Sequence, residues 1–231
     1  MLAELESVLV AIPQGSEMAD YRAAIIDRNI LGKSTESTRQ KSLRHLRELY
    51  ALDEEIAIFG LLRKLYAIDP SSLPSLAIQV AWTRDPLLRA TSARILESYE
   101  NDVVIPSDLA AAIEVTFPGK YSELNRDKIA RNALSSWSQS GHLLGRTKKV
   151  RRRLKTTPVA VTLALFLGEI SGYHGSAVFS NPWCRLLDLN ADRAKALGLE
   201  AHRAVLLNLR AIGDVVEISF PSLINFQPAS A

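Results

Sequence analysis

The chain has 231 residues, of which 47% are hydrophobic and 23% charged, and its formal net charge is +3. This composition is that of a globular protein with one domain or two small ones, and it excludes a disordered chain. The single cysteine, Cys184, excludes an intramolecular disulfide and any multi-cysteine zinc or iron–sulfur site. We expect a cytoplasmic protein, because one cysteine suits a reducing compartment and residues 1–10 lack the basic start of a secretory signal.

The first half of the chain is predicted to be helical, because apolar residues recur at helical spacing between polar caps, prolines and glycines. In the helix predicted to begin at Ser34 or Thr35, for example, Leu43, Leu46 and Leu49 form an apolar stripe behind a hydroxyl N-cap. The other helices predicted in this half cover residues 1–15, 17–28, 53–68, 76–82, 87–99 and 109–116.

Pro118 and Gly119 mark the predicted boundary between an N-terminal helical domain, 1–118, and a C-terminal helical domain, 119–231. The C-terminal domain is predicted to hold a helix from Ser122 or Asn125, a basic β-hairpin at 142–154, helices at 158–170, 192–197 and 200–211, and a strand at 215–220. The most apolar of these, 158–170, is shorter than the roughly 20 residues of a membrane helix, so we expect no membrane association. The predicted fold class is mostly α, a helical bundle with helix-turn-helix or winged-helix-like elements and short β-hairpins.

Positive charge is concentrated in one part of the sequence. Between Lys120 and Lys155, eleven basic residues are opposed only by Glu123 and Asp127, so this segment carries +9 and the rest of the chain −6. A protein with its positive charge gathered in this way usually faces a polyanion.

Residues 17–50 are predicted to form a helix–turn–helix element. A recognition helix carries small polar and basic side chains in its first turns, because these turns enter the major groove of DNA. The predicted DNA-contacting residues of this element are Lys33, Ser34, Thr35, Ser37, Thr38, Arg39, Lys41 and Arg44. The alternative is an ordinary capped surface helix.

Residues 125–155 resemble a winged helix, a helix followed by a basic β-hairpin whose side chains bind phosphates or the minor groove. The predicted contacts of this wing are Arg146, Lys148, Lys149, Arg151, Arg152, Arg153 and Lys155. The alternative is a solvated basic loop. Residues 191–220 also suggest helix–turn–helix followed by a strand, but acidic residues offset the basic ones there, and we interpret this part as a packing module.

Signals of catalysis are weak. The four histidines are scattered, and the sequence contains no HExxH, phosphate-loop or dinucleotide-binding motif. We therefore expect no enzymatic activity, no catalytic residue, no metal, no cofactor and no small-molecule substrate.

The stretch RAAIIDRNILGKSTESTRQKSLRHLRELYAL, residues 22–52, resembles the N-terminal signature of BrxA proteins, the small component of BREX bacteriophage-exclusion systems. The matching residues are Asn29, Leu31, Lys33, Ser34 and Thr38, whereas Arg39 falls one place earlier than in the signature. The apolar helix at 56–68 and the segment 131–143 follow in the expected order. The resemblance implies a helical, non-enzymatic DNA-binding protein that acts beside larger ATPase, methyltransferase and phosphatase-like partners.

The sequence thus predicts a non-enzymatic protein that binds double-stranded DNA within a BREX-like phage-defence system, where other defence proteins are its expected partners. The alternative is an adaptor whose basic face binds an acidic protein partner. RNA binding is the third hypothesis, and it ranks below the others because the sequence lacks an aromatic stacking motif of the RRM kind.

Overall fold

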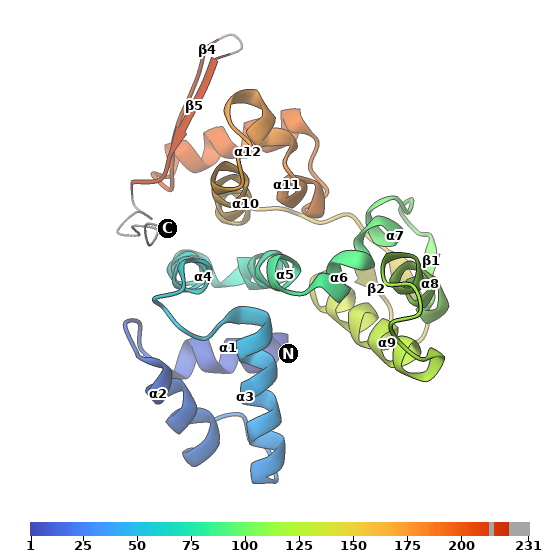
Figure 1. Cartoon of the computed structure of the whole chain (residues 1–231). Helices are drawn as coiled ribbons and strands as arrows, with labels where there is room; N and C mark the ends of the chain where they lie inside the picture. The colour runs from blue at the N-terminus through green and yellow to red at the C-terminus, as the bar shows by residue number, and fades with distance from the viewer. Residues whose placement is uncertain (213–214, 222–231) are drawn as a thin grey trace.

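The computed structural model describes residues 1–212 and 215–221, and it shows a mostly helical protein with two small antiparallel sheets (Figure 1). The mostly α fold class and the presence of short β-hairpins are therefore confirmed. Figure 1 shows α4 (Ala57–Ile68) and α5 (Leu73–Arg84) in the middle of the molecule, with other groups of helices on either side of them.

The N-terminal helices are α1 (Leu2–Ala11), α2 (Met18–Arg22), the π-helical turn η1 (Ala23–Asp27) and α3 (Glu36–Tyr50). The helices predicted at 17–28 and 34–50 are confirmed. Thr35 is the N-cap of α3, and its hydroxyl accepts a hydrogen bond from the Thr38 amide. α3 packs against α1, η1 and α5, so one side of it is covered and the other is left to solvent.

A buried arginine fastens these helices to the middle of the molecule. The side chain of Arg63, on α4, is 3% exposed, and it lies 3.2 Å from a carboxylate oxygen of Glu54. It also donates to the Tyr21 hydroxyl and to the Ile12 carbonyl. These bonds satisfy a guanidinium that burial would otherwise destabilise.

The chain from 69 to 104 contains η2 (Pro70–Ser72), α5, two short helices α6 (Pro86–Ala90) and α7 (Ser92–Leu96), and the strand β1 (Val103–Val104). The single helix predicted at 87–99 is therefore wrong. The break lies at Thr91, whose hydroxyl donates to the Leu88 carbonyl and accepts from the Trp137 indole at 2.8 Å. A side chain that bonds to the last free carbonyls favours a helix end at that position.

The next part consists of α8 (Pro106–Thr116), α9 (Glu123–Gln139) and the hairpin of β2 (Leu143–Leu144) and β3 (Lys149–Arg151). The predicted hairpin is confirmed, but β3 also pairs with β1, giving a three-stranded sheet in the order β1-β3-β2. Because α8 packs on α9 and β1 pairs with β3, both contacts cross the boundary predicted at 118–119. Residues on its two sides thus belong to one packed unit.

The C-terminal part consists of α10 (Pro158–Ile170), η3 (Gly175–Ser180), α11 (Pro182–Leu186), α12 (Ala191–Arg203) and the hairpin of β4 (Asn208–Ile212) and β5 (Val215–Ser219). α10 packs against α4, α5, α11 and α12, which explains why it is apolar on every side. No helix in residues 1–212 and 215–221 has both the length and the apolar character to cross a membrane.

Two predictions around α12 are wrong. The helices predicted at 192–197 and 200–211 are not separated at Gly198, because α12 continues through it to Arg203. The missing side chain lets α12 approach Leu165 and Leu209 closely; a Cβ at Gly198 would lie 3.2 Å from each. The helix predicted at 200–211 ends at Arg203, and 208–212 is strand β4, paired with β5 from Asn208↔Ser219 to Ile212↔Val215. The predicted strand at 215–220 is confirmed as β5.

Candidate nucleic-acid interface

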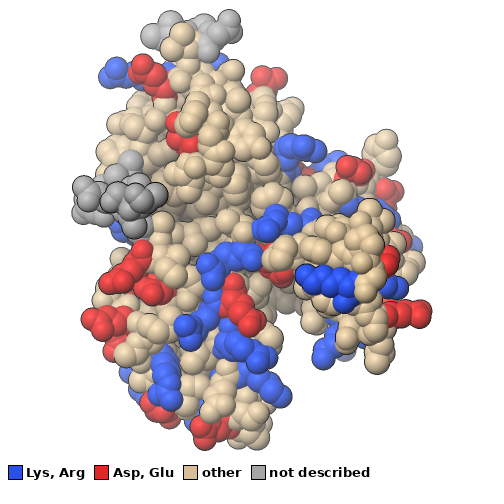
Figure 2. Space-filling view, in the orientation of Figure 1, with Lys and Arg blue, Asp and Glu red and all other residues tan. Residues whose placement is uncertain are grey.

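The solvent-facing side of α3 carries three basic residues at intervals of three, Lys41, Arg44 and Arg47. All three are exposed, and the Arg44 side chain is 64% accessible. The nearest carboxylate to Arg44 is Glu48, at 3.8 Å and itself exposed, so it neutralises Arg44 only weakly. Within the described residues, Lys41 and Arg47 form no ion pair. Figure 2 shows Lys and Arg side chains along this side of the molecule and across its middle.

A groove of about 570 Å³ lies beside these residues, and we call it the arginine groove. Four arginines line it: Arg22 from α2, Arg44 and Arg47 from α3, and Arg84 from the end of α5. Its one acidic residue is Glu48. Arg84 is held in place because its guanidinium donates to the Glu48 carbonyl at 3.0 Å and to the Arg47 carbonyl at 3.2 Å. A cation at the C-terminal end of a helix is also favoured by the helix dipole.

A second groove, of about 590 Å³, continues from the first, since Arg84 and Glu48 line both. It lies between α3, the α5–α6 junction and α9, and Figure 2 shows the hollow between α3 and the lobe formed by α6 to α9. Its α9 wall carries the polar side chains of Asn132, Ser135, Ser136 and Gln139 beside the apolar Ile129 and Ala133. The two grooves together present four arginines from α2, α3 and α5 on one side and a mixed polar and apolar wall from α9 on the other.

The start of α3 is built differently from the prediction. Thr35 and Thr38 bond to each other's backbone amides, so their hydroxyls already stabilise the helix start. The Lys33 ammonium lies 3.0 Å from the Glu4 carboxylate. Burial alone would raise the pKa of Glu4, but the hydrogen bond from Lys33, a backbone hydrogen bond and the N-terminal ammonium together outweigh it, and the pKa falls to about 2. The Arg39 guanidinium donates to the Ile26 carbonyl. Of the predicted residues at this helix start, Ser34, Thr35, Ser37 and Thr38 are exposed, whereas Lys33 and Arg39 are half-buried.

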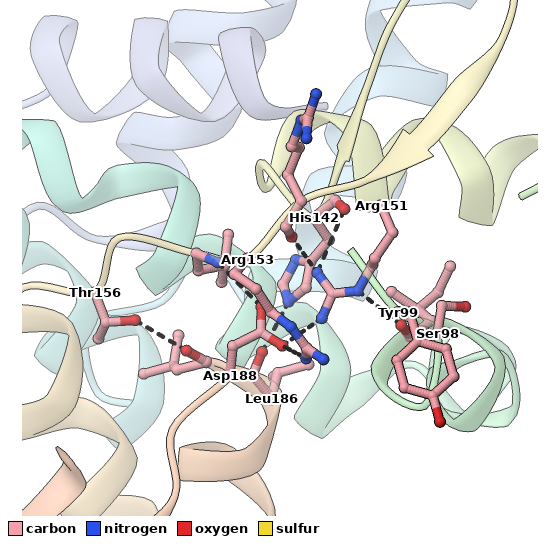
Figure 3. A network of polar contacts seen from close by, with 12 residues as sticks. Ser98, Tyr99, His142, Arg151, Arg153, Thr156, Leu186 and Asp188 are labelled. Atoms are coloured by element: carbon pink, nitrogen blue, oxygen red, sulfur yellow. Dashed lines mark hydrogen bonds and ion pairs between the residues drawn. The ribbon is translucent and has the colours of Figure 1, made fainter. Parts of the chain in front are cut away.

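The prediction that Arg151 contacts phosphate is wrong. Its side chain is 0% exposed and forms an ion pair with Asp188, which is 3% exposed. It also donates to the Ile95 carbonyl at 2.8 Å, so the guanidinium is fully engaged inside the protein (Figure 3). In β3 the side chains alternate between the two faces of the sheet, and Arg151 lies on the inner face opposite Leu143.

Asp188 is the centre of this buried network (Figure 3). Its carboxylate pairs with Arg151, lies 2.9 Å from Arg153, and accepts from the Leu154 amide at 3.0 Å. Nearby, His142 contacts the Leu186 carbonyl through Nε2 at 2.8 Å and the Ser140 hydroxyl through Nδ1 at 2.7 Å. Since a carbonyl only accepts, Nε2 carries a proton. Burial lowers the pKa of His142 to about 4. The network joins the hairpin to the turn between α11 and α12.

The other basic residues of the hairpin differ in whether they bond to other groups of the protein. Arg152 bonds to Asn101 and lies 3.7 Å from Glu100, and the Lys149 ammonium donates to the Gly145 carbonyl at 2.6 Å. Arg146, Lys148 and Lys155 are exposed, with no carboxylate partner within the described residues. The tip needs a glycine, because Gly145 has φ 109° and a Cβ there would lie 2.1 Å from the Lys148 carbonyl oxygen.

The two predicted clusters do not meet in one surface. Figure 1 shows α3 and β2 on opposite sides of the α5–α6 junction. Sequence reasoning also missed two residues of the arginine groove, Arg22 and Arg84. Arg22 precedes the predicted helix–turn–helix contacts, and its spacing from Arg44 gave no sign that they face each other. Arg84 lies 36 residues after Glu48, and only packing brings it to the end of α3.

The described part of the chain holds neither a metal-ligating cluster nor an accessible thiol. Among residues 1–212 and 215–221, no three His, Cys, Asp or Glu side chains come together as a metal site requires. Cys184 is buried, and burial raises the pKa of its thiol to about 12, so the reactive thiolate is disfavoured. Comparisons with protein-family models, curated proteins and solved structures find no match for this chain.

Proposed function

We propose that this protein binds double-stranded DNA through α3 and the arginine groove, without catalysing a reaction. The observation that carries the proposal is the charge around the groove. Arg22, Lys41, Arg44, Arg47 and Arg84 provide five positive charges, and Glu48 is the one acidic residue that lines the groove. Elsewhere in the described chain, several arginines are neutralised by nearby carboxylates. A surface whose cations outnumber its carboxylates favours a polyanionic ligand.

The proposed docking places the solvent side of α3 against the duplex. Arg44, Arg47 and Arg84 neutralise phosphates, while Ser34 and Ser37 at the helix start face the base edges. In this proposed docking, α2 with η1 serves as the first helix of a helix–turn–helix element and α3 serves as its recognition helix. The tip of the β2–β3 hairpin carries the exposed Arg146 and Lys148. It is a second basic surface, separate from the arginine groove.

The C-terminal helices offer a second arrangement of the winged-helix kind, because α12 is followed by the β4–β5 hairpin. Charge argues against it as the main interface. On α12, Arg193 and Arg203 are accompanied by Asp192 and Glu200, and in the hairpin Arg210 is paired in register with Glu217. Mixed charge gives little net attraction to phosphate.

We further propose that the protein acts in a BREX-like phage-defence system, beside other defence proteins. The support is the resemblance of residues 22–52 to the BrxA signature. This stretch contains α3 and three of the groove arginines, so the resemblance and the charge point to the same part of the molecule.

The test is a fluorescence-anisotropy titration of labelled random-sequence duplex at about 50 and 200 mM salt. The variant Lys41→Gln, Arg44→Gln, Arg47→Gln removes three charges without touching the core. It should weaken binding at least about tenfold at the lower salt and reduce the salt slope by about two to three. Single-stranded DNA and RNA are titrated in parallel.

The matched control is Arg193→Gln, Arg203→Gln, Arg210→Gln, which removes the same charge from exposed positions on α12 and β4. It should bind duplex within about twofold of the wild type, apart from the small effect of net charge. Equal losses in the two triple variants would mean that binding follows total charge and not the arginine groove. A wild-type protein that prefers single strands or RNA would contradict the choice of duplex DNA.

A further inference from the structure

The three-stranded sheet has an apolar outer face. Val103 of β1 and Leu144 of β2 both pair in register with Val150 of β3, so their side chains form one row across the sheet. Val103 is 38% and Leu144 59% exposed, and Ile105, which follows β1, is 49% exposed. We call these four residues the sheet patch.

The sheet patch is not part of the core. The core side of the same strands is formed by Val104, Leu143 and Arg151, each at most 3% exposed. In an antiparallel sheet with one face on the core, the other face is usually polar. Here Val, Leu and Ile occupy that outer face, and a contiguous exposed apolar patch marks an interaction surface.

The hairpin tip beside the patch is positively charged. Arg146 and Lys148, at the tip of the hairpin that carries Leu144 and Val150, have no carboxylate partner within residues 1–212 and 215–221. The acidic groups nearby are already engaged: Asp108 pairs with Arg94 at 2.8 Å, and Glu100 lies 3.7 Å from Arg152. Asp102 accepts from the Tyr99 amide.

We propose that the sheet patch binds an acidic, apolar-anchored segment of a partner protein. The apolar row needs an apolar complement, which a phosphate backbone does not offer, and the unpaired Arg146 and Lys148 need carboxylates. A second copy docked symmetrically through the same patch would bring two sets of these cations together, which is unfavourable. Because the patch and the arginine groove lie on different sides of the α5–α6 junction, both ligands can be bound at once (Figure 1).

The probe is a fluorescein-labelled peptide of about eight residues, the length of an ordinary strand, in which Glu alternates with Leu. A second peptide replaces each Leu by Ser and keeps the charge. The protein should bind the Glu–Leu peptide and not the Glu–Ser peptide. The variant Val103→Thr, Leu144→Gln should weaken this binding about tenfold or more, because it removes two anchors that binding buries. Arg146→Gln with Lys148→Gln should weaken it about two- to fivefold for each charge and reduce its salt dependence.

The matched control is Val115→Thr, Leu124→Gln, at apolar positions on α8 and α9 that are 81% and 77% exposed. It should leave peptide binding unchanged. The single change Leu144→Gln, at the most exposed residue of the patch, serves as a second variant if the double change alters the circular dichroism spectrum or melting temperature. It should also weaken peptide binding while the spectrum stays that of the wild type.

Three results would overturn the proposal. One is equal binding of the two peptides, and another is unchanged binding by the Leu144→Gln variant. The third is a wild-type dimer in light scattering that Leu144→Gln dissociates, since the patch would then join two copies of the chain. Duplex DNA affinity is measured on the same variants and should not change. The test therefore fails or succeeds independently of the proposed DNA binding.

Discussion

Replacing Asp188 by Asn should destabilise the protein strongly, although the change removes only one charge. The Asp188 side chain is 3% exposed and is the counter-ion of Arg151, which is 0% exposed. Removing one partner of a buried ion pair costs about 3–5 kcal/mol, because the remaining charge stays buried without compensation. Asparagine keeps an oxygen that can accept from Arg151 and from the Leu154 amide, so we expect the lower end, about 3 kcal/mol.

Asn is the right replacement at this position. Asp188 has φ 59°, in the left-handed region that Asn tolerates better than other residues, so the substitution adds little backbone strain. A loss of about 3 kcal/mol is a large part of the 5–15 kcal/mol that stabilises a typical domain. It should lower the melting temperature by about 6–12 °C in a chain of this size. Urea titration followed by circular dichroism gives the free energy of unfolding directly.

The control is Arg153→Gln, which removes the other cation that contacts Asp188. The Arg153 side chain is 47% exposed, so its pair with Asp188 is screened by solvent and should contribute at most about 1 kcal/mol. The double variant Arg151→Met, Asp188→Asn should lose less stability than its two single changes added together. If Asp188→Asn and Arg153→Gln cost the same, the buried pair with Arg151 does not hold the hairpin to the α11–α12 turn.

Two further predictions concern stability. His142 is neutral in the fold and its pKa is lowered to about 4, whereas the unfolded chain protonates it near pH 6.5. The free energy of unfolding should therefore be independent of this group above pH 6.5 and should decrease by about 3 kcal/mol as the pH falls from 6.5 to about 4. Urea titrations across this range should show this decrease, and His142→Gln should remove it. Gly168→Ala should cost about 1–3 kcal/mol, because a Cβ there would lie 2.2 Å from the Asn181 amide nitrogen, which is buried. Gly198→Ala, which meets only the ends of Leu side chains, should cost less in the same measurement.

Local signals in the sequence predicted the helices well. The N-caps Thr35 and Ser122 were each one of two predicted candidates, and the bounds of α10 agree with the prediction. These features depend on residues within a few positions of each other, because caps, prolines and helical periodicity act over one or two turns. The errors at Thr91, Gly198 and 204–211 occur where a residue from another element decides the outcome, such as Trp137 at Thr91, Leu165 at Gly198 and β5 opposite β4.

The sequence by itself determined that the chain is mostly helical and where its charges lie along the chain, including the basic residues of α3 and of the hairpin. The tertiary structure decided which of those charges reach solvent. Arg151 and Arg146 are five positions apart in the same hairpin, yet one is buried against Asp188 and the other is exposed. Arg22 and Arg84 are far apart in sequence, yet they line one groove with Arg44. Burial and ion pairing depend on long-range packing, and a local pattern of charges carries no information about the carboxylate that folding will bring beside each one.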